Sequence, residues 1–275
     1  MKIVSFNVNS VRLRLHQLQA LIEKHSPDVI GLQETKVQDK DFPVDAIAEM
    51  GYESAYFGQK THYGVALLSK LPCKNITMGF PGDDDEAQKR LITGEYLIGG
   101  KGSKKTITII NGYFPQGENR KHEVKFPAKE KFYADLSDYL QQRQKKTSKL
   151  AVIGDFNIAP LDNDIGIGAD NAKRWLRTGA TCFLPEEREW LQTLFDWGLV
   201  DTYREKYPNE SELFSWFDYR SKGFEREPKR GLRIDHLLAT RSLSKKLVDS
   251  GIDYDIRAME KPSDHCPVWS EFDLS

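Results

Sequence analysis

Short apolar runs with a strand-like pattern recur along the whole chain. They are rich in β-branched and aromatic residues, and glycine, proline, asparagine or charged residues separate them, which is typical of β-strands. The expected strands are residues 2–8, 28–33, 52–58, 64–69, 90–98, 105–114, 149–157, 213–220, 232–239, 252–257 and 266–273.

Fewer segments have the periodicity of a helix. In residues 13–25 and 129–146, apolar side chains recur every three or four positions, which predicts amphipathic helices. A third helix is expected over residues 185–198, because Pro185 and two glutamates suit its first turn and Gly198 suits its end. Strands outnumber helices, so we expect two packed sheets with helices on the outside rather than a repeated βαβ unit.

The composition limits the number of domains and the kinds of partner that the sequence can have. The 275 residues include 39% hydrophobic and 29% charged side chains, with a net charge of −1. This length suits one large domain or two small ones, and no repeat or long linker divides the chain. The near-zero charge argues against global attraction to nucleic acid, although basic residues can still gather locally.

Cysteine usage and hydropathy predict a cytoplasmic protein. Cys73, Cys182 and Cys266 form no CxxC pair, and their odd number argues against a disulfide framework. No stretch approaches the roughly 18 apolar residues of a membrane span. The segment MKIVSFNVNS at the start has too short an apolar run for a signal peptide.

Several expected strands end in polar side chains. Carboxylates stand at Glu34, Asp155 and Asp235, and amides or a hydroxyl stand at Asn7, Asn111, Tyr113 and Asn157. Each acid by itself is most simply a turn residue or a helix cap. If the acids converge with Asp264, however, they repel one another unless a cation lies among them. Carboxylate and amide oxygens favour Mg²⁺ or Mn²⁺ over zinc.

The segment KPSDHCPVWS places an acid, an imidazole and a thiol side by side. Asp264, His265 and Cys266 allow three interpretations: a Cys/His nucleophile pair, a metal site, or a histidine oriented by an aspartate.

A set of motifs resembles one known family. SFNVNSVR, IGLQETK, HYGVALLSK, NGYFPQG, GDFNIAP, FSWFDYRSKGF, GLRIDHLLA and PSDHCPV occur in the order seen in exonuclease III-type proteins. These are bacterial DNA-repair members of the endonuclease/exonuclease/phosphatase superfamily, and the match runs from Asn7 to Pro267.

The resemblance implies a fold and an activity. The fold is a DNase I-like α/β protein, a four-layer α/β/β/α sandwich of two mixed β-sheets flanked by helices, with residues 1–275 as a single catalytic domain. The activity is phosphodiester hydrolysis with Mg²⁺, for which Mn²⁺ can substitute. The implied reactions are 3′-to-5′ exonuclease action, abasic-site incision, 3′-phosphate removal and ribonuclease H activity. The partner is double-stranded DNA with abasic sites, nicks or blocked 3′ ends, without a membrane, and the protein is expected to be a monomer.

Site residues follow by similarity. Glu34 is the expected main metal ligand, and Asp155 would position or deprotonate the attacking water. Tyr113 would offer its hydroxyl to the phosphate, Asn157 would donate to it, and Asp235 and Asn111 would support the network. The full set of expected metal-site residues is Asn7, Glu34, Asp155, Asn157, Asp264 and His265, and the expected catalytic residues are Tyr113, Asp155, Asn157, Asp264 and His265.

Within this framework, KPSDHCPVWS contributes a histidine that stabilises charge on the phosphate. We expect Asp264 to fix the tautomer of His265. Adjacent residues on a strand point to opposite faces, so Cys266 is expected to point away as a packing residue. Zinc is disfavoured because Cys73 and Cys182 lie outside any motif with ligand spacing.

Basic and aromatic residues are interleaved in two segments, RSKGFEREPKRGLR and KRWLR. A charge run is usually a solvated face, but this mixture suits a nucleic-acid backbone and groove. Trp216, Phe217 and Leu232 lie in segments that resemble the family's lesion pocket. The expected substrate-binding residues are Arg90, Gln116, Arg177, Trp216, Phe217, Lys222 and Leu232.

The chain departs from the family's usual pattern at His236, at Cys266 and in two loops, Gly99–Lys105 and Glu225–Lys229. Two alternative functions are compatible with parts of this pattern. A phosphoesterase of the same fold acting on a phospholipid headgroup is disfavoured by the basic-aromatic segments. A non-catalytic DNA-binding module is disfavoured because Glu34, Asp155 and His265 are all present.

Overall fold

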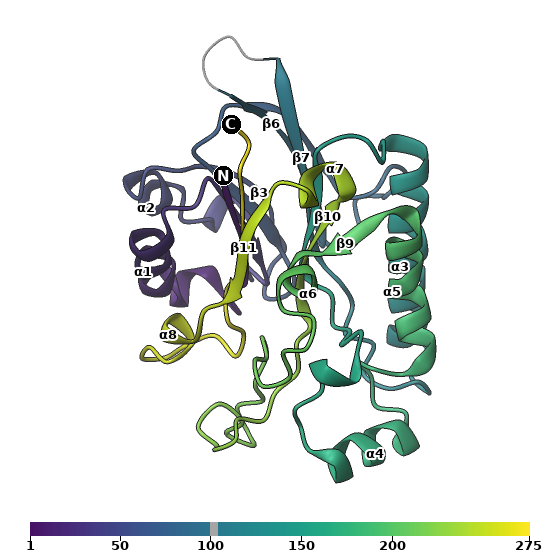
Figure 1. Ribbon diagram of the computed structural model, residues 1–275. Helices are drawn as coiled ribbons and strands as arrows, with labels where there is room; N and C mark the ends of the chain where they lie inside the picture. Colours follow the sequence, from purple (N-terminus) through teal and green to yellow (C-terminus); the bar gives the residue numbers. More distant parts are fainter. Residues whose placement is uncertain (100–103) are drawn as a thin grey trace.

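Two six-stranded sheets lie face to face between layers of helices, in a computed structural model that describes residues 1–99 and 104–275 (Figure 1). This is the four-layer arrangement of mixed sheets that the sequence predicts. Four residues of the variable loop Gly99–Lys105, residues 100–103, lie outside the described part.

The first sheet has the strand order β11-β12-β1-β2-β4-β3. Strands β1 and β2 are parallel, and their other neighbours are antiparallel. Apolar side chains of α1, Leu18 and Leu21, pack on the outer face of this sheet against Val4 and Phe6. The bounds are β1 (Lys2–Asn7), α1 (Leu15–His25), β2 (Val29–Gln33), α2 (Val44–Glu49), β3 (Glu53–Phe57), β4 (Val65–Ser69), β11 (Leu247–Ile252), α8 (Tyr254–Arg257) and β12 (Val268–Phe272), with short 3-10 turns η1 (Val11–Leu13) and η2 (Asp39–Asp41).

The second sheet has the order β5-β6-β7-β8-β10-β9, with β7 and β8 parallel. Helices α3 and α5 cover its outer face, where Leu136 and Leu194 join one apolar cluster with Ile110 and Val152. The bounds are β5 (Cys73–Met78), β6 (Leu91–Ile98), β7 (Lys105–Tyr113), α3 (Lys125–Arg143), β8 (Leu150–Asp155), η3 (Asp162–Asp164), α4 (Ala169–Thr178), α5 (Pro185–Trp197), β9 (Leu199–Asp201), α6 (Thr202–Lys206), β10 (Asp235–Thr240) and α7 (Arg241–Ser244).

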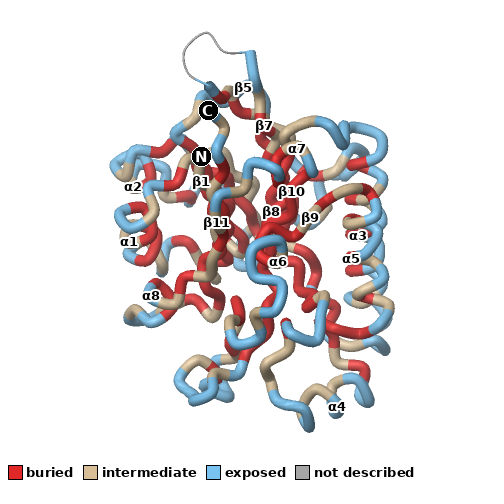
Figure 2. Tube along the Cα trace, in the orientation of Figure 1, coloured by how far each residue is buried: buried red, intermediate tan, exposed pale blue. Residues whose placement is uncertain are grey.

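Alternation along the strands divides the core into layers. Ile3 and Val29 point between the sheets with Ile109 and Ile153, whereas Val4 belongs to the outer cluster under α1. The central strands are buried along their length, while the helices expose one side (Figure 2). Each central strand therefore presents one set of inward side chains, which is what brings residues from both sheets together at one end.

Two predicted strands are wrong. Residues 213–220 form no regular strand, and Trp216 makes only isolated bridges to Leu232 and His265. Residues 252–257 begin at the end of β11 and turn into α8, because Asp253 caps that helix by accepting hydrogen bonds from the backbone of Asp255 and Ile256. Both segments are rich in β-branched or aromatic residues, and this composition by itself does not distinguish a strand from an irregular segment or a short helix.

Strands β5, β9 and most of β11, and helices α2, α4, α6, α7 and α8, were not predicted from the sequence. They are short, or they lack a clear apolar period. In the described part of the chain, no helix has the length and apolar character needed to cross a membrane.

A layer of three polar side chains, the polar plug of Ser5, Gln33 and Asn111, lies between the sheets. It separates the apolar core from the end of the sandwich where β1, β2, β7 and β8 terminate. Gln33 Nε2 donates to Ser5 Oγ at 3.0 Å and to Asn111 Oδ1 at 2.6 Å. Asn111 Nδ2 in turn donates to the carbonyls of Leu32 and Ala66, both at 2.9 Å, and so joins the two sheets. The sheets approach this closely because position 31 is glycine, where a Cβ would lie 2.8 Å from Asn111 Oδ1.

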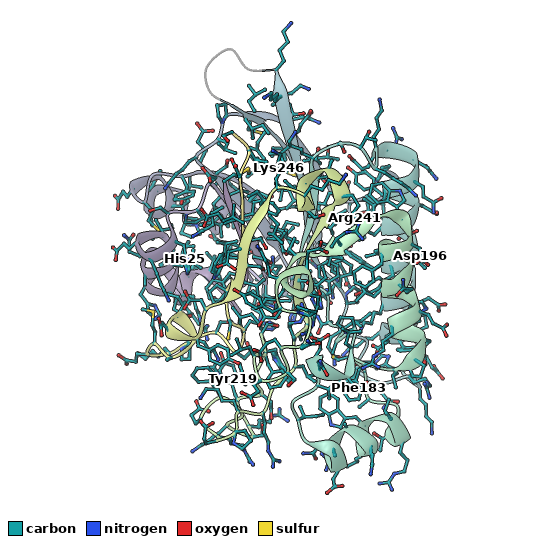
Figure 3. All side chains as sticks on the ribbon, in the orientation of Figure 1. His25, Phe183, Asp196, Tyr219, Arg241 and Lys246 are labelled. Carbon is teal, nitrogen blue, oxygen red and sulfur yellow. The ribbon has the colours of Figure 1, made fainter. Side chains whose placement is uncertain are left out.

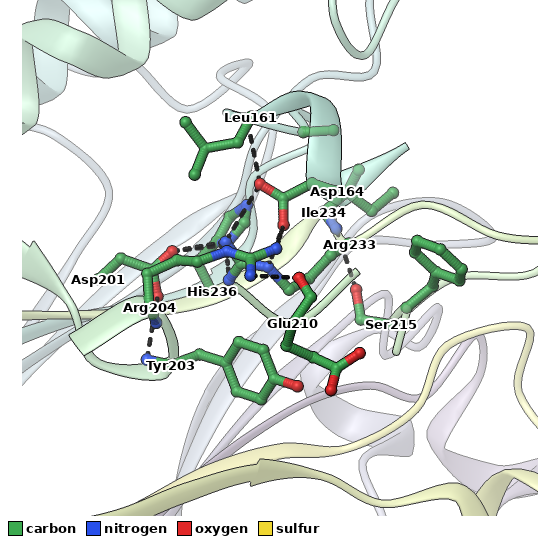
Figure 4. Close-up of polar contacts among 12 residues, drawn as sticks. Leu161, Asp164, Asp201, Tyr203, Arg204, Glu210, Ser215, Arg233, Ile234 and His236 are labelled. Carbon is green, nitrogen blue, oxygen red and sulfur yellow. Dashed lines mark hydrogen bonds and ion pairs between the residues drawn. The ribbon is translucent and has the colours of Figure 1, made fainter. Parts of the chain in front are cut away.

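A buried arginine organises the loops beside β10 (Figure 4). Arg233 Nε lies 2.6 Å from Asp164 Oδ1, and its Nη2 lies 2.6 Å from Asp201 Oδ2. Its Nη1 donates to His236 Nδ1 at 2.9 Å, and His236 Nε2 donates to the carbonyl of Ile158 at 2.8 Å. Burial and the charge of Arg233 lower the pKa of His236, so this ring is neutral with the proton on Nε2. The network ties η3 and β9 to the loop that follows β8.

We expect Arg233→Met to lower the free energy of unfolding by about 3–5 kcal/mol, because it leaves two buried carboxylates short of their shared cation. Urea unfolding at neutral pH measures this change. The matched control is Arg241→Met, which removes an exposed arginine 3.7 Å from Glu205 and should change stability by no more than about 0.5 kcal/mol. Equal stability of the Arg233→Met protein and the wild type would show that the network does not hold these loops.

Candidate active site

The inward-facing residues at one end of the sandwich form a single polar cluster. Asn7 ends β1, and Glu34 directly follows the adjacent parallel strand β2. Asp155 ends β8, and Asp235 begins the antiparallel strand β10, directly opposite Asp155. The two sheets thus supply the site in equal measure, and the strand topology brings together residues far apart in the sequence.

Asn7 joins the two carboxylates across the sheets. Its Nδ2 donates to Glu34 Oε1 at 2.9 Å and to Asp155 Oδ2 at 3.0 Å. Its Oδ1 accepts the backbone N–H of Asn9 at 3.0 Å, so the amide oxygen faces away from the carboxylates. This geometry differs from the expected role of Asn7 as a metal ligand, because the nitrogen, which cannot bind a cation, faces the site.

His265 is paired with Asp235. Its Nδ1 lies 2.9 Å from Asp235 Oδ2, and its Nε2 points toward Asp155, 3.8 Å from Oδ2. Ser215 Oγ donates to the same Asp235 oxygen at 2.6 Å and accepts the Asp235 backbone N–H at 2.9 Å. Burial by itself would lower the pKa of His265, but the negative charges of Asp235 and Asp155 raise it to about 10. The ring is therefore a cation that presents an Nε2–H donor to the site.

The expectation that Asp264 orients His265 is wrong. Asp264 Oδ1 accepts from Asn9 Nδ2 at 2.9 Å, and Oδ2 accepts from the indole Nε1 of Trp216 at 3.0 Å. Neighbours in an extended segment point to opposite sides, so a residue next to His265 cannot face its ring. The same argument holds for Cys266, which is fully buried against Phe214 and Phe217, as expected of a packing residue.

The donor set of the cluster fits a divalent cation. One ligand atom each from Glu34, Asp155 and His265 lies within 4.8 Å of the others. Burial, with the nearby charges of Asp235 and Glu34, raises the pKa of Asp155 against the lowering effect of His265. The ionised form of this carboxyl is thus short of positive charge, and a cation beside Glu34 and Asp155 would supply it. The protonated His265 suits a donor better than a ligand, and Asp264 faces away from this group.

Tyr113 and Arg90 border the cluster on the second sheet. Burial, together with the charges of Glu34 and Asp155, raises the pKa of the Tyr113 hydroxyl well above the usual value. The buried guanidinium of Arg90 stacks on Tyr113 and Tyr63, 4.6 and 4.2 Å from the ring centroids. Arg90 therefore fixes Tyr113 from behind, although the sequence suggested direct substrate contact.

Asn157 and Gln116 occupy the loops that follow β8 and β7. The Asn157 backbone N–H donates to Asp155 Oδ1 at 3.0 Å, and its Nδ2 donates to the carbonyl of Phe114 at 3.0 Å. This is the one acceptor that Nδ2 contacts among the described residues, and an amide nitrogen carries two hydrogens, so one N–H remains for a substrate. The exposed Gln116 side chain bonds Thr181 and the backbone of Glu118, within its own loop region. Asn111 lies behind the cluster, in the plug between the sheets.

Two segments project beyond this end of the sandwich, α4 and the loop of residues 208–231 (Figure 1). They line a cavity of about 380 Å³. Its lining includes Trp175 and Trp216 and four arginines, Arg174, Arg220, Arg226 and Arg230. Phe183 anchors α4 by stacking on Trp175, and Figure 3 shows Phe183 and Tyr219 on either side of this end. The exposed Arg177 and Lys222 lie on the same two segments.

Phe217 and Leu232 do not reach a surface. Phe217 is 0% exposed and packs against Phe214, Phe224 and Tyr254, so the expectation of direct substrate contact is wrong for it. Leu232 is also 0% exposed and supports Trp216 from behind. Trp216 itself is partly exposed and lines the cavity, which leaves it as the aromatic of the three that a substrate can touch.

Other residues near the site were not predicted. Lys36 Nζ lies 2.9 Å from Glu34 Oε2 and donates to Asn9 Oδ1, and Asn9 continues this chain to Asp264. Ser215 holds Asp235, and Tyr63 stacks on Arg90. All four of these residues lie inside the quoted motifs, but nothing in their spacing shows which way a side chain points.

Comparison with known proteins gives consistent results. Residues 4–265 match the Endonuclease/Exonuclease/phosphatase family. The chain is 56% identical over 272 residues to exodeoxyribonuclease III of Haemophilus influenzae, covering 99% of this chain and 100% of that protein. An AP endonuclease from Archaeoglobus fulgidus superposes with a TM-score of 0.89 at 33% identity, and a Neisseria 3′ phosphatase bound to a product DNA hairpin with 0.87 at 36%. Both alignments cover 100% of each chain.

Replacing Asp235 and replacing Asp264 should change the pKa of His265 by different amounts. We expect Asp235→Asn to lower the pKa of His265 by about 1–3, because it removes the charge that contacts Nδ1. Asp264→Asn should change it far less, since that carboxylate faces Asn9 and Trp216. NMR titration of the imidazole, with divalent cations chelated, measures both values. A larger fall in the Asp264→Asn protein would contradict the orientation described above.

Proposed function

The chain belongs to the endonuclease/exonuclease/phosphatase family, and we propose that it is a metal-dependent DNA-repair nuclease that hydrolyses phosphodiester bonds at abasic sites and at 3′ ends. The proposal includes 3′-to-5′ exonuclease, abasic-site endonuclease, 3′-phosphatase and ribonuclease H-like activities. The observation that carries it is the cluster of Glu34, Asp155 and His265 beside an arginine-lined cavity, in a chain 56% identical to an exodeoxyribonuclease III.

The proposed cofactor is Mg²⁺, with Mn²⁺ as a substitute. Glu34 and Asp155 would hold it, because hard cations prefer carboxylate oxygens. When bound, such an ion neutralises charge that develops on a phosphate oxygen. Asn7 bonds both carboxylates and so fixes their separation. The pairing of Lys36 with Glu34 limits the rotation of the Glu34 side chain.

The remaining groups act on the phosphate and the water. Asp155 Oδ2 lies 3.8 Å from His265 Nε2, where a carboxylate can position the attacking water or accept its proton. His265, held protonated by Asp235, donates from Nε2 to a phosphate oxygen and stabilises charge that grows in the transition state. The free Asn157 Nδ2–H and the Tyr113 hydroxyl are donors on the other side of the same phosphate.

The proposed substrate is double-stranded DNA with abasic sites, nicks or blocked 3′ ends. Arginines interleaved with indoles favour a nucleic-acid backbone, which supports DNA over a phospholipid headgroup. An intact cluster of acids and imidazole supports an enzyme over a non-catalytic DNA-binding module. Free cysteines at positions 73, 182 and 266 are compatible with a reducing, cytoplasmic location, and we propose that the protein acts as a monomer.

Replacing Glu34 tests the metal site. We expect Glu34→Gln to lower turnover on an abasic duplex at least ~100-fold with Mg²⁺, because it removes a charge and keeps the shape. Binding of the duplex, measured by anisotropy, should persist because the arginine-lined cavity is unchanged. Chelator should abolish turnover of the wild type. Full activity of the Glu34→Gln protein would exclude Glu34 from the site.

Replacing Trp216 tests recognition of the lesion. An abasic sugar is small enough to be flipped into a tight apolar pocket, whereas a 3′-phosphate needs no flipping. We therefore expect Trp216→Ala to slow abasic-site incision more than 3′-phosphate removal, measured on matched duplexes. Equal slowing of both reactions, with an unchanged melting temperature, would indicate that Trp216 supports the whole site and does not select the lesion.

A further inference from the structure

Helix α3 buries a lysine beneath the active site. Lys129 is 0% exposed, and its Nζ has three partners: Glu187 Oε1 at 2.5 Å, the Asn157 carbonyl at 2.8 Å and the Gln116 carbonyl at 3.2 Å. An ammonium group carries three N–H bonds, so all of its donors are used. Burying a lysine costs free energy unless it is paired and fully hydrogen-bonded, and this site satisfies both conditions.

The two carbonyls belong to the loops that carry site residues. Gln116 follows β7, which ends at Tyr113, and Asn157 follows β8, which ends at Asp155. The third partner, Glu187, accepts the backbone N–H of Leu184 through Oε2 at 2.8 Å and so fixes the start of α5. A single ammonium thus joins both active-site loops of the second sheet to the two helices behind them.

The backbone of Asn157 has a left-handed conformation, with a φ of +54°. Asparagine is one of the few non-glycine residues that adopt this conformation readily, and here hydrogen bonds to the surrounding carbonyls hold it in place. Neighbouring carbonyls are held as well: Tyr133, one turn after Lys129 on α3, donates to the carbonyl of Phe156 at 2.7 Å, and His236 donates to that of Ile158. Three consecutive carbonyls are therefore fixed from behind, and the middle one depends on Lys129.

We propose that Lys129 is a positioning residue of the nuclease, which orients the Asn157 amide toward the phosphate by fixing the Asn157 carbonyl. This inference rests on the proposed function. Lys129 does not touch the substrate, and it acts through Asn157. The competing account is a structural ion pair, in which Lys129 and Glu187 only hold α3 against α5.

A double substitution separates these accounts. Lys129→Met combined with Glu187→Gln removes both charges, so no unpaired ion remains buried. We expect kcat on a 3′-phosphate duplex to fall about 10- to 100-fold with little change in KM, as for other residues that orient groups of an active site. Lys131→Met, on the exposed side of the same helix, is the matched control and should match the wild type. A double variant with wild-type kcat would leave only the structural account.

Asn157 provides the second arm of the test. If Lys129 acts through Asn157, the same double substitution in an Asn157→Ala background should lower kcat no more than about threefold further, because coupled residues are not additive. A full 10-fold or greater loss in that background would overturn the proposal. Should the double variant not fold, Lys129→Arg keeps the charge opposite Glu187 with a planar head group. We expect it to lower kcat several-fold, and wild-type kcat in that folded protein would also overturn the proposal.

An NMR measurement distinguishes failure of this inference from failure of the proposed function. The side-chain amide signals of Asn157 should shift in the double variant and stay unchanged in Lys131→Met. A wild type that cleaves neither abasic nor 3′-phosphate duplexes with Mg²⁺ would refute the proposed function. Unshifted Asn157 signals in the double variant would refute the positioning role whatever the enzyme's activity.

Discussion

Burial of several carboxylates at one end of the sandwich is the constraint on which the site depends. Asp155 and Asp235 are buried and Glu34 beside them is partly buried, so like charges meet where water screens them weakly. Among the described residues, the imidazolium of His265, the amide of Asn7 and the Lys36 ammonium beside Glu34 compensate for these charges. They do not neutralise Asp155 completely, as its raised pKa indicates. The remaining deficit of positive charge is what makes this end of the molecule suited to a cation and then to a phosphate.

Such a cluster requires a rigid frame behind it, and polar side chains provide it. The plug of Ser5, Gln33 and Asn111 joins the sheets below the acids. On the outside of the second sheet, Lys129 and the Arg233 network hold the loops after β7, β8 and η3. Asn111 and Lys129 use their donors to fix backbone carbonyls next to the site, and Arg233 holds two carboxylates of the surrounding segments.

The basic surface next to the cluster of acids is exposed, whereas the cluster itself is largely buried. Helix α4 and the 208–231 loop extend from the sandwich, expose their basic residues and line a cavity rather than a core. They are joined to the site chiefly through Trp216, whose indole donates to Asp264. Asp264 in turn is linked through Asn9 and Lys36 to Glu34. A continuous set of hydrogen bonds and one ion pair thus connects the arginine-lined cavity to the Glu34 carboxylate.

The sequence by itself determined the main architecture and the membership of the site. Apolar periodicity predicted α1 and α3, the residues at its ends predicted α5, and short apolar runs predicted most central strands, because burial in the core selects apolar side chains at these positions. Motif resemblance identified Glu34, Asp155, Asn157, Asp235 and His265, which the structure brings together. It did not show which way neighbouring side chains point. That His265 pairs with Asp235 and not with the adjacent Asp264, that Phe217 is core while Trp216 is accessible, and that Lys129 supports Asn157 were decided only by the tertiary structure. These outcomes depend on contacts between residues far apart in the sequence, such as the hydrogen bond between Asn7 and Asp155, which are 148 positions apart. No local pattern encodes a contact made across two sheets.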